Sequence, residues 1–340
     1  MWFNKDLAKV VNNLHIKNSL LISLICVAVS HLTFAQNTTI FPDSVKKGRV
    51  LALGITGAAV YTGGMAILYN QWYSKSTQTG FHWFNDNGEW LQMDKAGHIY
   101  SGYTESRAAY GLLRWTGLRD EKAIWYAAGT GLLMQTSIEV FDAFSAKWGF
   151  SWGDITANFI GVGAFAAQQK IWGEQKITFK VSSDFRTYPA LLVSSIYPGE
   201  EPDLLNRRTN DLFGNSVLSS LLKDYNAQTN WISFNIASFC PERPSWLPRW
   251  LNISLGYSAE NMFGGFTNEW EYQSKKYVLN PAQYPRYRQF LISPDIDWTR
   301  IRTRSPWVKA LFFGLNMIKL PLPTLEVTSQ GNAHWHWLYF

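Results

Sequence analysis

The sequence predicts an α+β protein, in which a four-helix, membrane-associated bundle precedes a β-rich antiparallel region. Two patterns carry this prediction. Four long apolar segments lie within residues 50–172, and beyond residue 176 the apolar pattern becomes the alternation of strands. A third observation is composition: 46% of residues are hydrophobic and 16% aromatic, but only 16% are charged. Soluble proteins carry roughly 25% charged residues, so this composition favours a membrane surface.

The first segment, residues 1–35, is predicted to be a signal peptide. Three lysines precede the apolar run of residues 19–30, and Thr33 to Ala35 provide a small-residue cleavage site before Gln36. The run is short for a bilayer span, although an uncleaved anchor is the alternative. Cys26 follows an isoleucine, where a lipoprotein signal needs a small residue, so we do not predict lipidation there.

Cleavage would leave a mildly basic chain with one cysteine. It removes three lysines and one aspartate, which lowers the formal net charge from +6 to +4. A small, scattered excess of this kind fits anionic lipid or an envelope polymer and argues against nucleic-acid binding. Because only Cys240 remains, an intramolecular disulfide and a zinc-thiolate site are both excluded.

Residues 36–175 are predicted to form the helical bundle. Residues 50–69 carry no charge and have the length of a bilayer span, but glycines dilute their hydrophobicity, so a membrane span and a buried helix both stay open. An aromatic loop over residues 80–90 follows. Further helices are expected over residues 94–115, 122–144 and 152–172, with Ser151 as the N-cap of the last.

Residues 176–340 are predicted to be rich in antiparallel strands. Residues 250–259 and 286–300 alternate strictly between apolar and polar side chains. Further strands are expected over residues 177–183, 189–197, 231–239, 323–329 and 334–340, and helices over 211–224 and 306–318. The pattern fits a half-buried sheet packed on the helices or a small barrel with an apolar exterior. The terminal Phe340 favours the barrel, whereas the interrupting helices favour the sheet.

Polar residues in the bundle recur at helical spacing and define the candidate site. Each set shares one face of its own helix, and three such faces can converge. Polar groups within apolar helices are costly unless paired, so the convergence point is the best site candidate in the chain. The stripes are Asp94, His98 and Glu105 on the first helix, Gln135, Glu139 and Asp142 on the second, and Asp154 and Asn158 on the third.

Several kinds of chemistry fit this cluster. His98, Glu139 and Asp154 could ligate a divalent metal such as Zn or Mn, the only cofactor that the pattern suggests. Alternatively, they could be catalytic, with His98 as a general base oriented by Glu139 and with Ser151 or water as the nucleophile. A structural polar network that fixes the helix packing is the interpretation that we favour, and a site for a lipid or glycan headgroup is a further alternative. The binding candidates are Asp94, Glu105, Asp142, Ser151 and Asn158.

These motifs resemble a known family. The Asp94-Lys95-Ala96-Gly97-His98 start, Glu139 in the next helix and the Ser-x-x-Asp-x-x-x-Asn-x-x-Gly segment of residues 151–161 resemble the YfiM-like family of predicted periplasmic lipoproteins. They are more distantly similar to the VanZ-like family of small membrane proteins. VanZ-like proteins are associated with low-level glycopeptide resistance, and the YfiM-like family has no established activity. The resemblance covers residues 94–169 and implies an envelope location.

We therefore expect an exported protein at the outer membrane or its periplasmic face, with the inner membrane as the alternative. Its expected role is to bind membrane lipid, envelope glycan or another outer-membrane protein through a helical bundle with a polar core. The competing hypothesis is a membrane-associated hydrolase or metal-dependent enzyme that uses His98, Glu139 and Asp154.

Overall fold

Four long helices build the N-terminal half, as the sequence predicts. The computed structural model describes residues 41–340 except 43, 75, 185, 198 and 200, so the predicted signal peptide and Cys26 lie outside the described residues. The helices are α2 (Lys47–Leu68, continued by a π-helical turn, η1, Tyr69–Tyr73), α3 (Met93–Trp115), α4 (Asp120–Ala143) and α5 (Trp152–Trp172). The aromatic loop is largely irregular and ends in a 3-10 turn, η2 (Glu89–Gln92).

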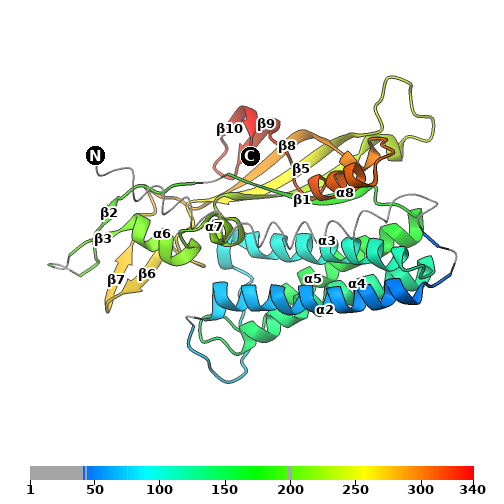
Figure 1. The fold of residues 1–340 in the computed structure, drawn as a ribbon. Helices are drawn as coiled ribbons and strands as arrows, with labels where there is room; N and C mark the ends of the chain where they lie inside the picture. Colours follow the sequence, from blue (N-terminus) through cyan, green and yellow to red (C-terminus); the bar gives the residue numbers. More distant parts are fainter. Residues whose placement is uncertain (1–40, 43, 75, 185, 198, 200) are drawn as a thin grey trace, which may run out of the picture.

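Helix α3 lies at the centre of the molecule. It packs on α4 and α5 on one side and faces β1 on the other, while α2 lies against the far side of α4 (Figure 1). The hydroxyl groups of Tyr61 on α2 and Ser137 on α4 are 2.7 Å apart. Glycines allow the central helices to approach closely: a methyl group at Gly161 of α5 would lie against the backbone of Ile99 on α3. Tyr103, Val162 and Phe165 fill the core beside this contact.

The C-terminal half contains a six-stranded antiparallel sheet that does not close into a barrel, so the sheet is the correct alternative. Its order is β1-β4-β5-β8-β9-β10. The bounds are β1 Ile177–Ser183, β4 Gln228–Asn235, β5 Leu251–Glu260, β8 Tyr287–Ile296, β9 Leu322–Thr328 and β10 Ala333–Tyr339. At the β1 edge, Val181 forms a single parallel bridge with Ile318, which follows α8 (Pro306–Leu315).

Several local predictions in this half are wrong. The strand expected over 189–197 is reduced to β2 (Leu192–Val193), which pairs with β3 (Asp203–Leu204). The helix expected over 211–224 is two helices, α6 (Leu205–Phe213) and α7 (Val217–Lys223), because Gly214 has a positive φ and Ser216 caps α7.

Two further corrections concern strand ends and a missed hairpin. Strands β4 and β8 end earlier than predicted, because Asn235 and Asp297 cap the short 3-10 turns η3 (Ile236–Phe239) and η4 (Trp298–Arg300). The hairpin of β6 (Glu269–Tyr272) and β7 (Lys275–Val278) was not predicted. Its turn residues, Gln273 and Ser274, have positive φ without the glycine or asparagine that marks such turns.

The sheet buries its polar face and exposes its apolar face. Residues paired across antiparallel strands point to the same side, so the register defines one continuous apolar row. Its members are all 39–56% exposed: Ile232, Leu255, Ile292, Leu325 and Trp335. On the opposite face the serines are buried, and Lys180 of β1 forms an ion pair of 2.6 Å with Asp295 of β8.

The exposed apolar row is the reverse of the arrangement expected for a sheet that buries its apolar face on helices. Two parts of this face follow that rule. At β1 the Phe179 ring lies 4.9 Å from that of Tyr103 on α3, and near the end of β5 Ala259 is buried against Met93 at the start of α3. Strands β9 and β10 lie farther from the helices than β1 does (Figure 1). A contiguous exposed apolar surface of this kind marks contact with lipid or another protein.

Candidate functional site

The polar cluster forms where three helix ends meet. Asp94 and His98 lie in the first turns of α3, Glu139 lies near the end of α4, and Asp154 lies in the first turn of α5. The three helix faces converge on His98, as the sequence analysis expected. The Nε2 atom of His98 lies 3.8 Å from Asp94 Oδ1, 3.7 Å from Glu139 Oε1 and 3.6 Å from Asp154 Oδ1. The side chain of His98 is 12% exposed, and that of Glu139 is fully buried.

The other ring nitrogen of His98 is held by α5. Its Nδ1 lies 3.0 Å from Asn158 Oδ1. An amide oxygen only accepts hydrogen bonds, so Nδ1 carries the proton and donates it to Asn158. In neutral His98, Nε2 therefore presents its lone pair to the surrounding carboxylates.

Lys95 provides one positive charge to this acidic cluster. Its Nζ is 2.6 Å from Asp154 Oδ1, 2.7 Å from Asp86 Oδ1 and 3.1 Å from Asp94 Oδ2. Asp86 comes from the aromatic loop, and Ser151 Oγ donates a hydrogen bond of 2.5 Å to the same oxygen. The loop is thereby tied to the start of α5.

Ser151 is bound as a cap. Its Oγ accepts a hydrogen bond of 3.1 Å from the backbone N–H of Asp154, as predicted for the N-cap of α5. Its own backbone N–H donates to Glu139 Oε2 at 3.4 Å. These contacts hold Ser151 in a structural position, whereas the nucleophile hypothesis would need its hydroxyl to donate to His98.

Two predicted site residues lie apart from His98. Glu105 accepts hydrogen bonds of 2.8 and 2.9 Å from Gln135 Nε2 farther along the bundle. Asp142 accepts a hydrogen bond of 2.8 Å from the Tyr73 hydroxyl at the end of the first helical segment. Each carboxylate therefore forms a separate pair between neighbouring helices.

Burial and mutual repulsion shape the ionisation of the cluster. Burial, followed by repulsion from Asp142, raises the pKa of Glu139 to about 9. Burial and the charge of Asp94 raise the pKa of Asp154 to about 10. Burial would also raise the pKa of Asp94, but the opposing effects of His98 and Lys95 hold it below its usual value. Without a further cation, Glu139 and Asp154 therefore keep their protons at neutral pH.

Sequence reasoning missed two partners of the cluster. Asp86 lies in an aromatic loop without helical periodicity, so no spacing relates it to the helices. Tyr225 lies between α7 and β4, and its hydroxyl donates to Asp94 Oδ1 at 2.9 Å. The contact joins the two halves of the chain across 131 positions, a separation that no local pattern reveals.

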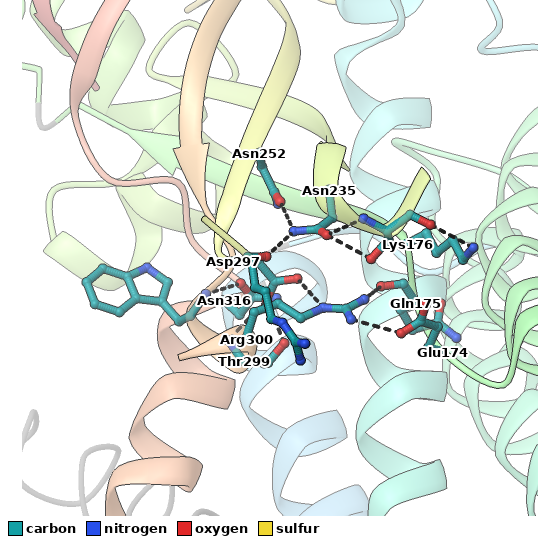
Figure 2. A network of polar contacts seen from close by, with 12 residues as sticks. Glu174, Gln175, Lys176, Asn235, Asn252, Asp297, Thr299, Arg300 and Asn316 are labelled. Atoms are coloured by element: carbon teal, nitrogen blue, oxygen red, sulfur yellow. Dashed lines mark hydrogen bonds and ion pairs between the residues drawn. The ribbon is translucent and has the colours of Figure 1, made fainter. Parts of the chain in front are cut away.

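A second candidate site lies at the other end of the helices, where α5 leads into β1. Figure 2 shows Arg300 at the centre of a polar network there: it pairs with Glu174 at 2.8 Å and with Asp297 at 3.4 Å. Arg300 also lines two open clefts of about 600 and 290 Å³. The basic residues that line them are Arg243, Arg249, Arg300, Arg302, Arg304 and Lys309.

Exposed indole rings flank these clefts in the sequence. Trp246 and Trp250 lie on either side of Arg249, and Trp307 lies two residues before Lys309. Trp246 is 77% and Trp307 is 64% exposed. The sequence signal for this site is the density of arginine and tryptophan over residues 243–250 and 300–309, although no spacing rule singles it out. The combination of cations with exposed indoles is typical of a membrane interface.

Comparison with known proteins supports an envelope protein of unknown activity. A family model described as a predicted periplasmic lipoprotein (DUF2279) matches residues 80–169, which include the whole His98 cluster except Tyr225. No curated protein and no solved structure matches the chain. The match supports an exported, envelope-associated location. The likeness to the YfiM-like and VanZ-like families stays a prediction, as does the absence of lipid on Cys26.

Proposed function

We propose that the protein is an envelope membrane protein that binds the anionic headgroups of phospholipids in the basic clefts around Arg300. The observation that carries this proposal is the joint occurrence of six basic residues and exposed tryptophans at one end of a molecule with an apolar exterior. The outer membrane or its periplasmic face is the proposed location, with the inner membrane as the alternative. Envelope glycan and a second membrane protein stay predicted partners.

The apolar exterior supports contact with lipid. One helix in the described residues, Lys47–Tyr73, is long and apolar enough to cross a membrane, and only 6% of its most apolar part is buried. A core helix of the same composition would be covered by protein. The apolar row of the sheet is exposed as well, so both halves of the chain present surfaces that lipid would stabilise.

The charge around the clefts supports binding of phosphate-bearing headgroups. Arg302 and Arg304 are exposed, and among the described residues neither has a protein partner in a hydrogen bond or ion pair. Arg300 is paired with carboxylates, so it shapes the cleft, while its two neighbours are available to a ligand. Guanidinium groups bind phosphate oxygens with two parallel hydrogen bonds.

Lipid-dependent thermal stability in detergent tests the proposal. We expect phosphatidylglycerol to raise the unfolding temperature of the protein more than phosphatidylcholine does. Each basic residue near an anionic surface contributes about 1 kcal/mol, so the double variant Arg302→Gln, Arg304→Gln should need roughly 30-fold more phosphatidylglycerol for the same effect. High salt should weaken the effect in the unmodified protein.

The matched control changes the same charge elsewhere. Lys275→Gln with Lys276→Gln neutralises two basic residues on β7, which lies far from α8 in Figure 1, and should leave the lipid effect unchanged. Equal responses of the two double variants would contradict the proposed site. An equal effect of inorganic phosphate or of phosphatidylcholine would contradict recognition of an anionic lipid headgroup.

A further inference from the structure

The surroundings of His98 Nε2 call for a positive charge. Nδ1 carries a proton that it donates to Asn158, so neutral His98 points a lone pair at three carboxylate oxygens. A lone pair facing anions in a buried site is repulsive unless a proton or a cation lies between them. The arrangement therefore has two kinds of solution: a proton, held by the imidazole or by one of the carboxyl groups, or a bound cation that His98 shares with the carboxylates.

The distances favour the shared cation. A charged N–H···O hydrogen bond spans about 2.7–2.9 Å, whereas the three separations at Nε2 are 3.6–3.8 Å. Two ligands of one tetrahedral metal ion, each about 2.1 Å from the metal, lie ~3.4 Å apart. The observed separations are thus too long for hydrogen bonds. They are within a few tenths of an ångström of the distance between two ligand atoms of one metal ion. The candidate ligand atoms of Asp94, His98 and Asp154 all lie within 4.8 Å of one another.

Glu139 supplies independent support. Its Oε1 atom is buried, has no hydrogen-bond partner among the described residues and lies 3.7 Å from His98 Nε2. An unpaired carboxylate oxygen in a fully buried position costs considerable free energy. Glu139 is not one of the compact set of Asp94, His98 and Asp154, but its position beside the same ring nitrogen makes it a fourth candidate ligand.

Neighbouring groups hold the candidate ligands in place. Lys95 binds Asp94 through Oδ2, which leaves Oδ1 directed at His98, and the Tyr225 hydroxyl donates to that Oδ1. Lys95 also pairs with Asp154 Oδ1 at 2.6 Å, so a metal at His98 would share that oxygen with Lys95. Asn158 orients the imidazole ring through Nδ1. Fixing a histidine ligand through its other nitrogen is the usual outer-shell arrangement of metal sites.

We propose that this cluster binds one divalent cation of the zinc or manganese class, with one imidazole nitrogen and three carboxylate oxygens as its protein ligands. Mixed imidazole and carboxylate ligands suit these ions. The site is independent of the proposed lipid clefts, which lie at the other end of the helices. The ligands are Asp94, His98, Glu139 and Asp154.

Metal analysis of the full chain tests this site. The purified protein is stripped with a chelator, dialysed against Zn²⁺ or Mn²⁺ and assayed by mass spectrometry and titration calorimetry. We expect about one bound ion per chain and a higher unfolding temperature with metal than without it. His98→Gln should lose both, and Asn158→Ala should weaken binding about 10- to 100-fold, because it removes the outer-shell partner of the histidine.

Two further variants keep the test decisive if His98→Gln folds poorly. Glu139→Gln keeps the shape of a ligand but removes its charge and should bind metal far more weakly. Glu105→Gln removes a carboxylate of the same bundle that lies outside the cluster and should bind as the unmodified protein does. Substoichiometric metal in the unmodified protein, or equal binding by Glu139→Gln and Glu105→Gln, would overturn the proposal.

Discussion

Replacing Gly161 by alanine tests the helix contact that assembles the His98 cluster. The added Cβ would lie against the carbonyl oxygen of Ile99 and 2.9 Å from its carbonyl carbon. Ordinary carbon–carbon contacts require about 3.5–4.0 Å, so α3 and α5 would have to separate by roughly 0.5–1 Å. Both atoms belong to backbone, so neither can rotate away. The core around Tyr103 and Phe165 would lose contact along the same seam.

The magnitude follows from two opposing terms. Overpacking a tight interface typically costs about 1–3 kcal/mol, and a backbone clash lies at the upper end of that range. Replacing glycine by alanine within a helix returns about 1 kcal/mol. At Gly163 of the same helix a Cβ meets nothing within 4 Å, so Gly163→Ala keeps only the favourable term. The two variants should therefore differ by about 3 kcal/mol in their free energies of unfolding.

Denaturant unfolding in detergent, followed by far-ultraviolet circular dichroism, measures this difference. Gly161→Ala should unfold at lower denaturant and Gly163→Ala at slightly higher denaturant than the unmodified protein. Because Asn158 lies one turn before Gly161 and Ile99 follows His98, Gly161→Ala should also weaken metal binding. A Gly161→Ala protein as stable as Gly163→Ala would refute the close contact of α3 and α5.

Three further predictions concern buried polar groups. The first two are measured as the free energy of unfolding against pH, and the third as the difference in that free energy between the variant and the unmodified protein. Burial lowers the pKa of Lys319 to about 8 in the folded protein, below its value in the unfolded chain. Between pH 8 and 10 the unfolded chain therefore binds more protons, and the free energy of unfolding should rise with pH. Lys319→Met should remove this rise and stabilise the protein at pH 7 by about 2 kcal/mol. Burial raises the pKa of Asp224 to about 6, so the free energy of unfolding should fall as pH rises from about 4 to 6. Asp224→Asn should flatten this dependence, because the amide oxygen does not titrate and can still accept the hydrogen bond from the Tyr188 hydroxyl. Ser151→Ala removes the N-cap of α5 and should cost about 1–2 kcal/mol; an unchanged stability would contradict the capping role.

The sequence predicted the bundle well because its signals are local. Caps such as Ser151 and long apolar runs mark helix bounds within a few residues, and i, i+4 spacing places Asp94 and His98 on one face. Convergence of the three stripes could be inferred because short connections force neighbouring helices together. The partners Asp86 and Tyr225 could not be inferred, since tertiary contacts across long stretches of chain place them.

The sheet was predicted less completely, for a physical reason. Strict alternation identifies β5 and β8 but cannot say which face is buried, because burial depends on what lies against the sheet. The structure buries Asp295 and Lys180 together and exposes Ile292, the reverse of the soluble pattern. Even the open form of the sheet was not decided by periodicity, since barrels and open sheets share the same period.

Contact between the apolar exterior and lipid is the central claim, and spin-label accessibility measures it most directly. In a Cys240→Ser background, a nitroxide is attached to a cysteine that replaces Ile55 on α2, Ile292 on β8 or Lys276 on β7, and the protein is reconstituted into phospholipid vesicles. At Ile55 and Ile292 we expect stronger relaxation by oxygen, which concentrates in lipid, than by a water-soluble nickel complex, with the reverse at Lys276. Stronger relaxation by the nickel complex at both isoleucine positions would contradict the claim.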